Sequence, residues 1–214
     1  MSDPELVTGV VDPELAAEFP GLAIHWVAVE AGSGRSPQAV RERLKEMSNR
    51  LSGPRAVQMR QEPVPWAYRV FFRQVGIDPD QRRTPIEQLV LNRLQHGGFR
   101  SRNLLDDAID IAVFETAVPI IAFDADRVDG GLGLRVSREA ELMGQAGRPL
   151  SSGQIVIADA ERALAVLFAD LDPDRGVTPQ TRRMLLSAVQ VEGVPDISIE
   201  EALWTVAEIV TGAA

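Results

Sequence analysis

The fold of this chain is decided by residues 68–124, YRVFFRQVGIDPDQRRTPIEQLVLNRLQHGGFRSRNLLDDAIDIAVFETAVPIIAFD. Helix-start and helix-stop signals follow one another along it. Thr84-Pro85-x-Glu87 is a capping box with proline at the first helical position, and Gly97-Gly98 stops the apolar pattern that follows it. A preceding helix over Pro65–Val75 is ended by Gly76. The sequence therefore predicts two helices joined by a basic loop.

A third helix and a strand complete this stretch. Leu104–Ala117 has apolar residues at helical spacing, which predicts a helix with one side buried. Pro119 then opens a short apolar strand, Ile120–Phe123. The order is helix, basic loop, helix, acidic helix and strand.

The rest of the chain adds mainly strands. Leu22–Glu30 is rich in β-branched residues and predicts a strand, and Ser36 is expected to cap a helix that begins at Pro37 and closes at Gly53. Further expected elements are strands at Leu132–Val136, Gln154–Ala158, Ala163–Phe168 and Met184–Val191, and a last helix capped by Ser198-x-x-Glu201 that runs to Val210.

These elements indicate an α+β fold, in which a mostly helical portion and a strand-rich portion form two lobes of one domain over residues 19–214. Residues 1–18 are expected to form an N-terminal arm or a short helix (Pro13–Glu18) that covers the body of the domain.

Charge reverses in the middle of the chain. Arg60 to Leu105 contains eight arginines and four acidic residues, whereas Asp106 to Gln145 contains nine acidic residues and three arginines. A basic segment next to an acidic one suggests a functional site at their junction.

Within that junction, Asn103, Asp107 and Asp110 share one face of the expected helix, because they are spaced by four and three residues. A polar row facing a cleft could bind an ammonium group or ribose hydroxyls. The alternative is a solvated helix face. Arg135 and Glu141 could likewise belong to a site or to an ion-paired surface.

Composition excludes several classes of protein. No cysteine is present, so disulfides, thiolate nucleophiles and cysteine-ligated zinc are excluded, and two histidines cannot build a multi-histidine metal site. No Gly-x-Ser-x-Gly elbow occurs, so the signature of a nucleophilic serine hydrolase is absent. We therefore expect neither a metal nor a cofactor. The run Asp124, Asp126 and Asp129 does not match the spacing of a calcium loop.

The net charge of −9 argues against a broad phosphate-binding surface, so a nucleic acid would have to dock on a local basic patch. No apolar run reaches the roughly 18 residues of a membrane span, and the acidic N-terminal residues differ from a secretory signal. A cytoplasmic location without membrane contact is the expectation.

The ordered series of motifs resembles the tRNA-editing (B3/B4) domain of the bacterial phenylalanyl-tRNA synthetase β subunit and its free-standing relatives, over roughly Phe19 to Val194. The residues that carry the resemblance are Tyr68-Arg69, Gly76-Ile77-Asp78-Pro79, Arg82-Arg83-Thr84-Pro85-Ile86-Glu87, Gly97, Asn103, Asp107, Pro119, Asp124, Arg135, Glu141, Ser152-Gly153-Gln154, Asp159, Thr178 and Thr181. The chain departs from the family at Asp110, Val113 and Ile121, where asparagine, serine and glycine are usual.

The resemblance implies a mixed α/β fold that encloses a pocket. In the synthetase that pocket receives the 3′ end of a mischarged tRNA and hydrolyses the tyrosyl ester with a bound water. By this resemblance the catalytic residues are expected among Asn103, Asp107, Asp110 and Glu141. The residues expected to bind substrate or RNA are Arg69, Arg73, Arg82, Arg83, His96, Arg100, Arg102 and Arg135.

Three hypotheses remain open, and the third is a purely structural, partner-binding relative on the same fold. The first is a tRNA-binding or editing protein, an aminoacyl-tRNA deacylase whose partner is the aminoacylated 3′ end. The second is a non-catalytic module on the same fold that binds an amino acid or a related small molecule, which the carboxylate at Asp110 and the acidic net charge favour.

Overall fold

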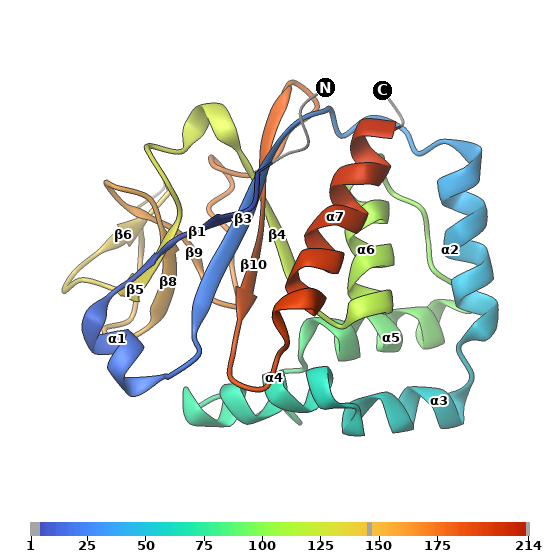
Figure 1. Ribbon diagram of the computed structural model, residues 1–214, viewed down its shortest axis with the longest axis horizontal. Coiled ribbons are helices and arrows are strands. Elements are labelled where there is room, and N and C mark those ends of the chain that lie inside the picture. The colour runs from blue at the N-terminus through green and yellow to red at the C-terminus, as the bar shows by residue number, and fades with distance from the viewer. Residues whose placement is uncertain (1–4, 145–146, 213–214) are drawn as a thin grey trace.

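The computed structural model describes residues 5–144 and 147–212, and Figure 1 shows their arrangement. Its main sheet has the strand order β1-β3-β10-β4, and every neighbouring pair is antiparallel. The central strand pair joins the two ends of the chain, since Arg183–Gln190 pairs along its whole length with Ala23–Glu30. The four strands are β1 (Val7–Thr8), β3 (Ala23–Glu30), β10 (Arg183–Gln190) and β4 (Ile120–Asp124).

Two helices, α6 (Leu104–Thr116) and α7 (Asp196–Gly212), run beside each other along this sheet, and α2 (Gln38–Arg50) lies outside α6 (Figure 1). Their shared core includes Ile24 and Leu186 from the sheet and Leu203 from α7, all with no exposed surface. Burying an aliphatic side chain of this kind stabilises a fold by about 1.5–3 kcal/mol.

A second helical group closes the base of the sheet. It consists of α3 (Gly53–Gln58), the 3-10 turn Met59–Gln61, α4 (Pro63–Gln74) and α5 (Pro85–His96). The phenol of Tyr68 on α4 donates a 2.8 Å hydrogen bond to the carbonyl of Val189 on β10. Complete burial raises the pKa of this phenol, so it remains a neutral donor that links α4 to the sheet.

The strand-rich portion is a second sheet with the order β2-β5-β8-β9 and a two-stranded ribbon, β6-β7. Strand β2 pairs in parallel with β5, and the remaining pairs are antiparallel. The strands are β2 (Val10–Val11), β5 (Gly133–Val136), β6 (Leu142–Met143), β7 (Arg148–Pro149), β8 (Ile155–Ala158) and β9 (Ala163–Val166). The mixed α+β architecture predicted from the sequence is confirmed.

The N-terminal segment is more regular than expected. Besides the predicted helix α1 (Pro13–Glu18), it supplies β1 to the main sheet and β2 to the second sheet. Gly9 lies between these strands, and a Cβ atom there would meet the carbonyl oxygen of Leu132 at 2.1 Å. The segment therefore joins the two sheets at a point where only glycine fits. Residues 1–4 of the expected arm lie outside the described residues.

Several helix boundaries differ from those expected, and α4 spans Pro63–Gln74 where the sequence predicts Pro65–Val75. The N-cap of α2 is Pro37, because the hydroxyl of Ser36 bonds elsewhere, to Asp107. Gly53 does not close α2 but begins α3, where Ser52 accepts from the backbone of Arg55. Helix α7 begins at Asp196, so Ser198 lies inside its first turn.

Among the helices of residues 5–144 and 147–212, none combines the length and apolar character needed to cross a membrane.

Candidate functional site

Two adjoining cavities lie beside α6. The α6 cavity, about 240 Å³, is apolar apart from Asp110 and Ser187. The rim cavity, about 480 Å³, is lined by basic side chains, namely Arg93, His96, Arg100 and Arg102, together with apolar ones. The α6 cavity is lined by Pro85, Leu89, Ile109, Asp110, Val113, Pro119, Ile120, Ile121, Ile157, Leu167, Phe168, Ala169, Ser187 and Val189. The rim cavity is lined by Pro85, Gln88, Leu89, Asn92, Arg93, His96, Gly98, Phe99, Arg100, Arg102 and Asp110. Pro85, Leu89 and Asp110 line both, so an apolar space meets a basic one at a carboxylate.

Asp110 is the titratable group at this boundary, and its side chain is 18% exposed. Burial raises its pKa to about 6, and the guanidinium of Arg102 opposes that rise. Arg102 donates from Nη2 to Oδ2 of Asp110 at 2.9 Å. Its side chain is 54% exposed, so solvent weakens the opposing effect. At neutral pH Asp110 is therefore mostly ionised but close to its pKa.

The cations of the rim cavity differ in how firmly they are held. Arg93 donates to the hydroxyl and the carbonyl of Ser48, at 3.2 and 2.5 Å, which fixes α5 against α2. His96 bonds through Nδ1 to the carbonyl of Asn92 at 2.7 Å, and its Nε2 has no hydrogen-bond partner among the residues that the structure describes. Arg100 is exposed and has no ion pair within residues 5–144 and 147–212. The rim thus offers Arg100, Arg102 and His96 to an anionic ligand.

Asp107 lies on the same helix but does not line either cavity. Its carboxylate has no exposed surface. One oxygen accepts from the hydroxyls of Ser36 and Ser101, both at 2.5 Å, and the other accepts from the backbone of Arg102 at 2.8 Å. These bonds tie the start of α6 to the loop before it and to the loop before α2.

Asn103 caps the same helix. Its side chain accepts from the backbone of Asp106 and donates to the Asp106 carboxylate, both at 2.9 Å. Of the predicted polar row, only Asp110 lines the two cavities; Asn103 and Asp107 hold the N-terminus of α6 in place.

Glu141 belongs to the strand-rich portion and does not line either cavity. Arg135 donates two hydrogen bonds to the Glu141 carboxylate, of 2.5 and 2.8 Å, and the backbone N–H groups of Arg138 and Ala163 also donate to it. The bonds from Arg135 are the main cause that lowers the pKa of Glu141 to about 2. This pair braces the loop between β5 and β6.

The other predicted RNA-binding arginines lie away from the rim cavity. Arg69 is buried between Glu87 and Asp80, at 2.6 and 2.7 Å. The guanidinium of Arg73 stacks over Trp66, and Arg82 donates to the carbonyl of Phe168 at 3.0 Å. Arg83 lines a separate apolar groove on α3 and α5.

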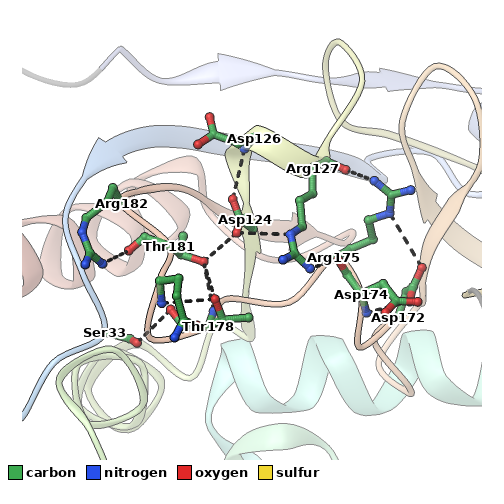
Figure 2. Close-up of polar contacts among 11 residues, drawn as sticks. Ser33, Asp124, Asp126, Arg127, Asp172, Asp174, Arg175, Thr178, Thr181 and Arg182 are labelled. Atoms are coloured by element: carbon green, nitrogen blue, oxygen red, sulfur yellow. Dashed lines mark hydrogen bonds and ion pairs between the residues drawn. The ribbon is translucent and has the colours of Figure 1, made fainter.

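A second polar cluster, shown in Figure 2, surrounds Asp124 at the end of β4. Thr181 donates to Asp124 at 2.6 Å, and the backbone of Thr178 donates to the Thr181 hydroxyl at 3.0 Å. Arg175 donates to the carbonyl of Arg127 and lies 3.9 Å from Asp172. These contacts fasten the loop before β10 onto β4. Among the described residues, no group of three or more His, Asp or Glu side chains could hold a metal ion.

Several cavity residues were missed in the sequence, namely Ile157, Leu167, Phe168 and Ser187. Ile157 and Ser187 belong to β8 and β10, and Leu167 and Phe168 follow the end of β9, so all four are distant in sequence from α6. Periodicity alone does not show which buried face borders a cavity. Ser187 offered a signal, because it is a polar residue in the buried run of β10, where it donates to the carbonyl of Ile121 at 3.0 Å.

Comparisons with known proteins identify the family. The model of the B3/4 domain matches residues 67–200. Among curated proteins, the phenylalanine–tRNA ligase β subunit of Nitrosococcus oceani is 31% identical over 116 residues, and that of Vibrio vulnificus is 29% identical over 109. These matches cover 53% and 50% of this chain but 14% of each relative. An N-terminal fragment of the phenylalanyl-tRNA synthetase β subunit from Pyrococcus horikoshii matches 97% of this chain and 52% of its own, with a TM-score of 0.44 and 12% identity. Since the family model spans well over half of the sequence, the chain belongs to the B3/4 domain family.

Proposed function

We propose that this protein binds the aminoacylated 3′ end of a tRNA and hydrolyses its ester with a positioned water. The observation that carries the proposal is the apolar α6 cavity meeting the basic rim cavity at Asp110. The aminoacylated end of a tRNA matches these two cavities, because an apolar amino-acid side chain lies next to a ribose and its phosphates. Similarity to phenylalanine–tRNA ligase β subunits supports a tRNA as the molecule to which the amino acid is esterified.

In this proposal the rim supplies a local basic patch on an otherwise acidic protein. Arg100, Arg102 and His96 would contact the terminal phosphates, whose neutralisation releases counterions and makes affinity depend on salt. The aminoacyl side chain would enter the α6 cavity, between Val113 and Ile121. Val113 lacks the hydroxyl of the serine that the family usually has there, and Ile121 fills space that the usual glycine leaves open.

Asp110 acts as the general base. Its carboxylate takes a proton from a water as the water oxygen attacks the ester carbonyl carbon. The tetrahedral intermediate then collapses, the bond from the acyl carbon to the ribose oxygen breaks, and Asp110 returns the proton to that oxygen. A pKa of about 6 suits this task, because a base close to the working pH both accepts and returns protons; such groups contribute roughly 10²–10⁴-fold.

Asn103 and Asp107 would act as positioning residues that fix the α6 N-terminus, and Glu141 as a brace of the strand-rich portion, since none of the three lines the two cavities. A second candidate function is the binding of a free amino acid without catalysis. Asp110 favours it, because a partly buried carboxylate beside an apolar space can pair with an ammonium group.

The test is a deacylation assay with tRNA specific for phenylalanine carrying tyrosine, together with a panel of other mischarged tRNAs. We expect hydrolysis of at least one substrate, and a loss of about 100-fold in Asp110→Asn. Glu115→Gln is the matched control, because it makes the same carboxylate-to-amide change on α6 outside both cavities. Absence of deacylation and of RNA binding at low salt would exclude the editing function, and binding of free amino acids alone would favour the second candidate.

A further inference from the structure

A third cavity lies next to the α6 cavity and shares part of its wall. This α1 cavity, about 370 Å³, is lined by residues that include Phe19 near α1, Val75 at the end of α4, Arg82 and Gln154. Ile155 lines the α1 cavity and Ile157 the α6 cavity. Residues two apart on a strand face the same side, so the two cavities follow one another along one face of β8.

Leu167 and Phe168 are the residues that line both cavities. Leu167 is held in the second sheet, because its backbone donates to the carbonyl of Ile155 at 2.9 Å. The half-buried Phe168 follows it, just beyond the end of β9. Leu167 and Phe168, the two residues that follow β9, therefore form the wall that the two cavities share.

The backbone of Phe168 adopts an uncommon conformation, with φ of +53°, in the left-handed region that suits glycine. Such a conformation persists only where surrounding contacts enforce it. Arg82 holds the Phe168 carbonyl at 3.0 Å. The centroid of the Phe168 ring lies 5.2 Å from that of Phe72, 5.8 Å from that of Tyr68 and 6.2 Å from that of Phe71, all on α4. The fold thus holds a residue with a strained backbone in the wall that the two cavities share.

We propose that Phe168 sets the largest side chain that the α6 cavity accepts, by separating it from the α1 cavity. The proposal rests on the function proposed above and adds its size limit. Replacing Phe168 with glycine would remove the partition and relieve the backbone strain at the same position.

The experiment measures binding of amino-acid amides of increasing size, from alanine through leucine, phenylalanine and tyrosine to tryptophan and 4-phenylphenylalanine. The intact protein is expected to bind the smaller amides. Above a certain size in the series, its affinity is expected to fall by at least about tenfold from one amide to the next. Phe168→Gly is expected to raise the affinity for the larger amides by about tenfold, and to change the affinity for the smallest amides by less than that. Phe168→Leu keeps an apolar side chain and should give an intermediate limit.

Phe114→Leu is the matched control, because Phe114 lines none of the three cavities and makes its ring contact with Phe99. It should leave the size limit unchanged. Circular dichroism at the assay temperature identifies which variants are folded, and Phe168→Leu carries the test if Phe168→Gly unfolds. A size limit that is the same in the intact protein and in a folded Phe168 variant overturns the proposal while the proposed function stands. Absence of binding of every amide together with absence of deacylation overturns both.

Discussion

Asp110 in the helical portion and Glu141 in the strand-rich portion are both carboxylates paired with an arginine, yet their pKa values move in opposite directions. Glu141 receives two bonds from Arg135 and two more from backbone N–H groups, and its pKa falls to about 2. Asp110 receives one bond, from a half-exposed Arg102, and burial raises its pKa to about 6. Burial is the main cause of the shift at Asp110, and the bonds from Arg135 are the main cause at Glu141. This difference separates a group that can exchange protons from a structural brace.

Asp107 extends this comparison to a buried carboxylate with three donors, two hydroxyls and a backbone N–H. Asp107→Asn places an amide where one or more of these donors need an acceptor, and unsatisfied buried polar groups are costly. We expect a loss of about 3 kcal/mol in the free energy of unfolding, measured by urea denaturation. Glu115→Gln should change it by less than about 0.5 kcal/mol. A loss below about 1 kcal/mol in Asp107→Asn would show that these bonds do not hold α6 in place.

Glu141→Gln tests the brace. Because the folded pKa lies below the ordinary value of 4.5, the ionised side chain stabilises the fold above pH 4.5, and this contribution disappears as the pH falls toward 2. We expect a loss of about 2 kcal/mol at pH 7 that shrinks below pH 4. The exposed Glu139→Gln is the control. An equal effect of Glu141→Gln at pH 7 and pH 3 would contradict the assignment.

Asp110→Asn should act in the opposite direction. Its folded pKa of about 6 lies above the ordinary value of 3.8, so its charge destabilises the fold increasingly as the pH rises from 4 through 6. We expect this variant to be more stable than the intact protein by about 1–2 kcal/mol at pH 7, with the difference vanishing near pH 4. Thermal unfolding at the two pH values checks the sign. A destabilised variant at pH 7 would mean that the bond from Arg102 outweighs burial.

Arg100→Ala is expected to have the smallest effect on stability, within about 0.5 kcal/mol, because Arg100 is exposed. If the rim cavity holds phosphates, the same change weakens binding of tRNA and reduces the slope of log affinity against log salt by about one. Arg43→Ala, which removes an exposed arginine outside the rim cavity, serves as the comparison. An unchanged salt slope in Arg100→Ala would remove Arg100 from the proposed RNA contact.

Local signals predicted the helices well where the sequence contains both a cap and an apolar period. The capping box at Thr84 and Glu87 forms as expected, and Gly97 ends α5 in the left-handed conformation. Strands of two residues have no period to read, so β1 and β2 were missed. The local sequence favours Ser36 as a helix cap, because the partner that its hydroxyl binds, Asp107, is 71 positions away and gives no local signal.

The same limit applies to the site. Helical spacing correctly put Asp107 and Asp110 near one another on α6, but it cannot tell which of them faces protein and which faces a cavity. That distinction depends on Ser36 and on strands of the second half of the chain. The charge reversal near residue 105 lies beside the two cavities of the candidate site. Arg69, although it lies within the basic segment, pairs internally with Glu87 and Asp80.

The dependence of deacylation on pH tests most directly whether Asp110 is the working base. After subtraction of spontaneous hydrolysis, the rate for a mischarged tRNA should rise with pH and reach half of its plateau near pH 6, the pKa of Asp110. The half-point should vanish in Asp110→Asn and persist in Glu115→Gln. A catalysed rate without a half-point near pH 6, or one with the same profile in Asp110→Asn, would contradict this account.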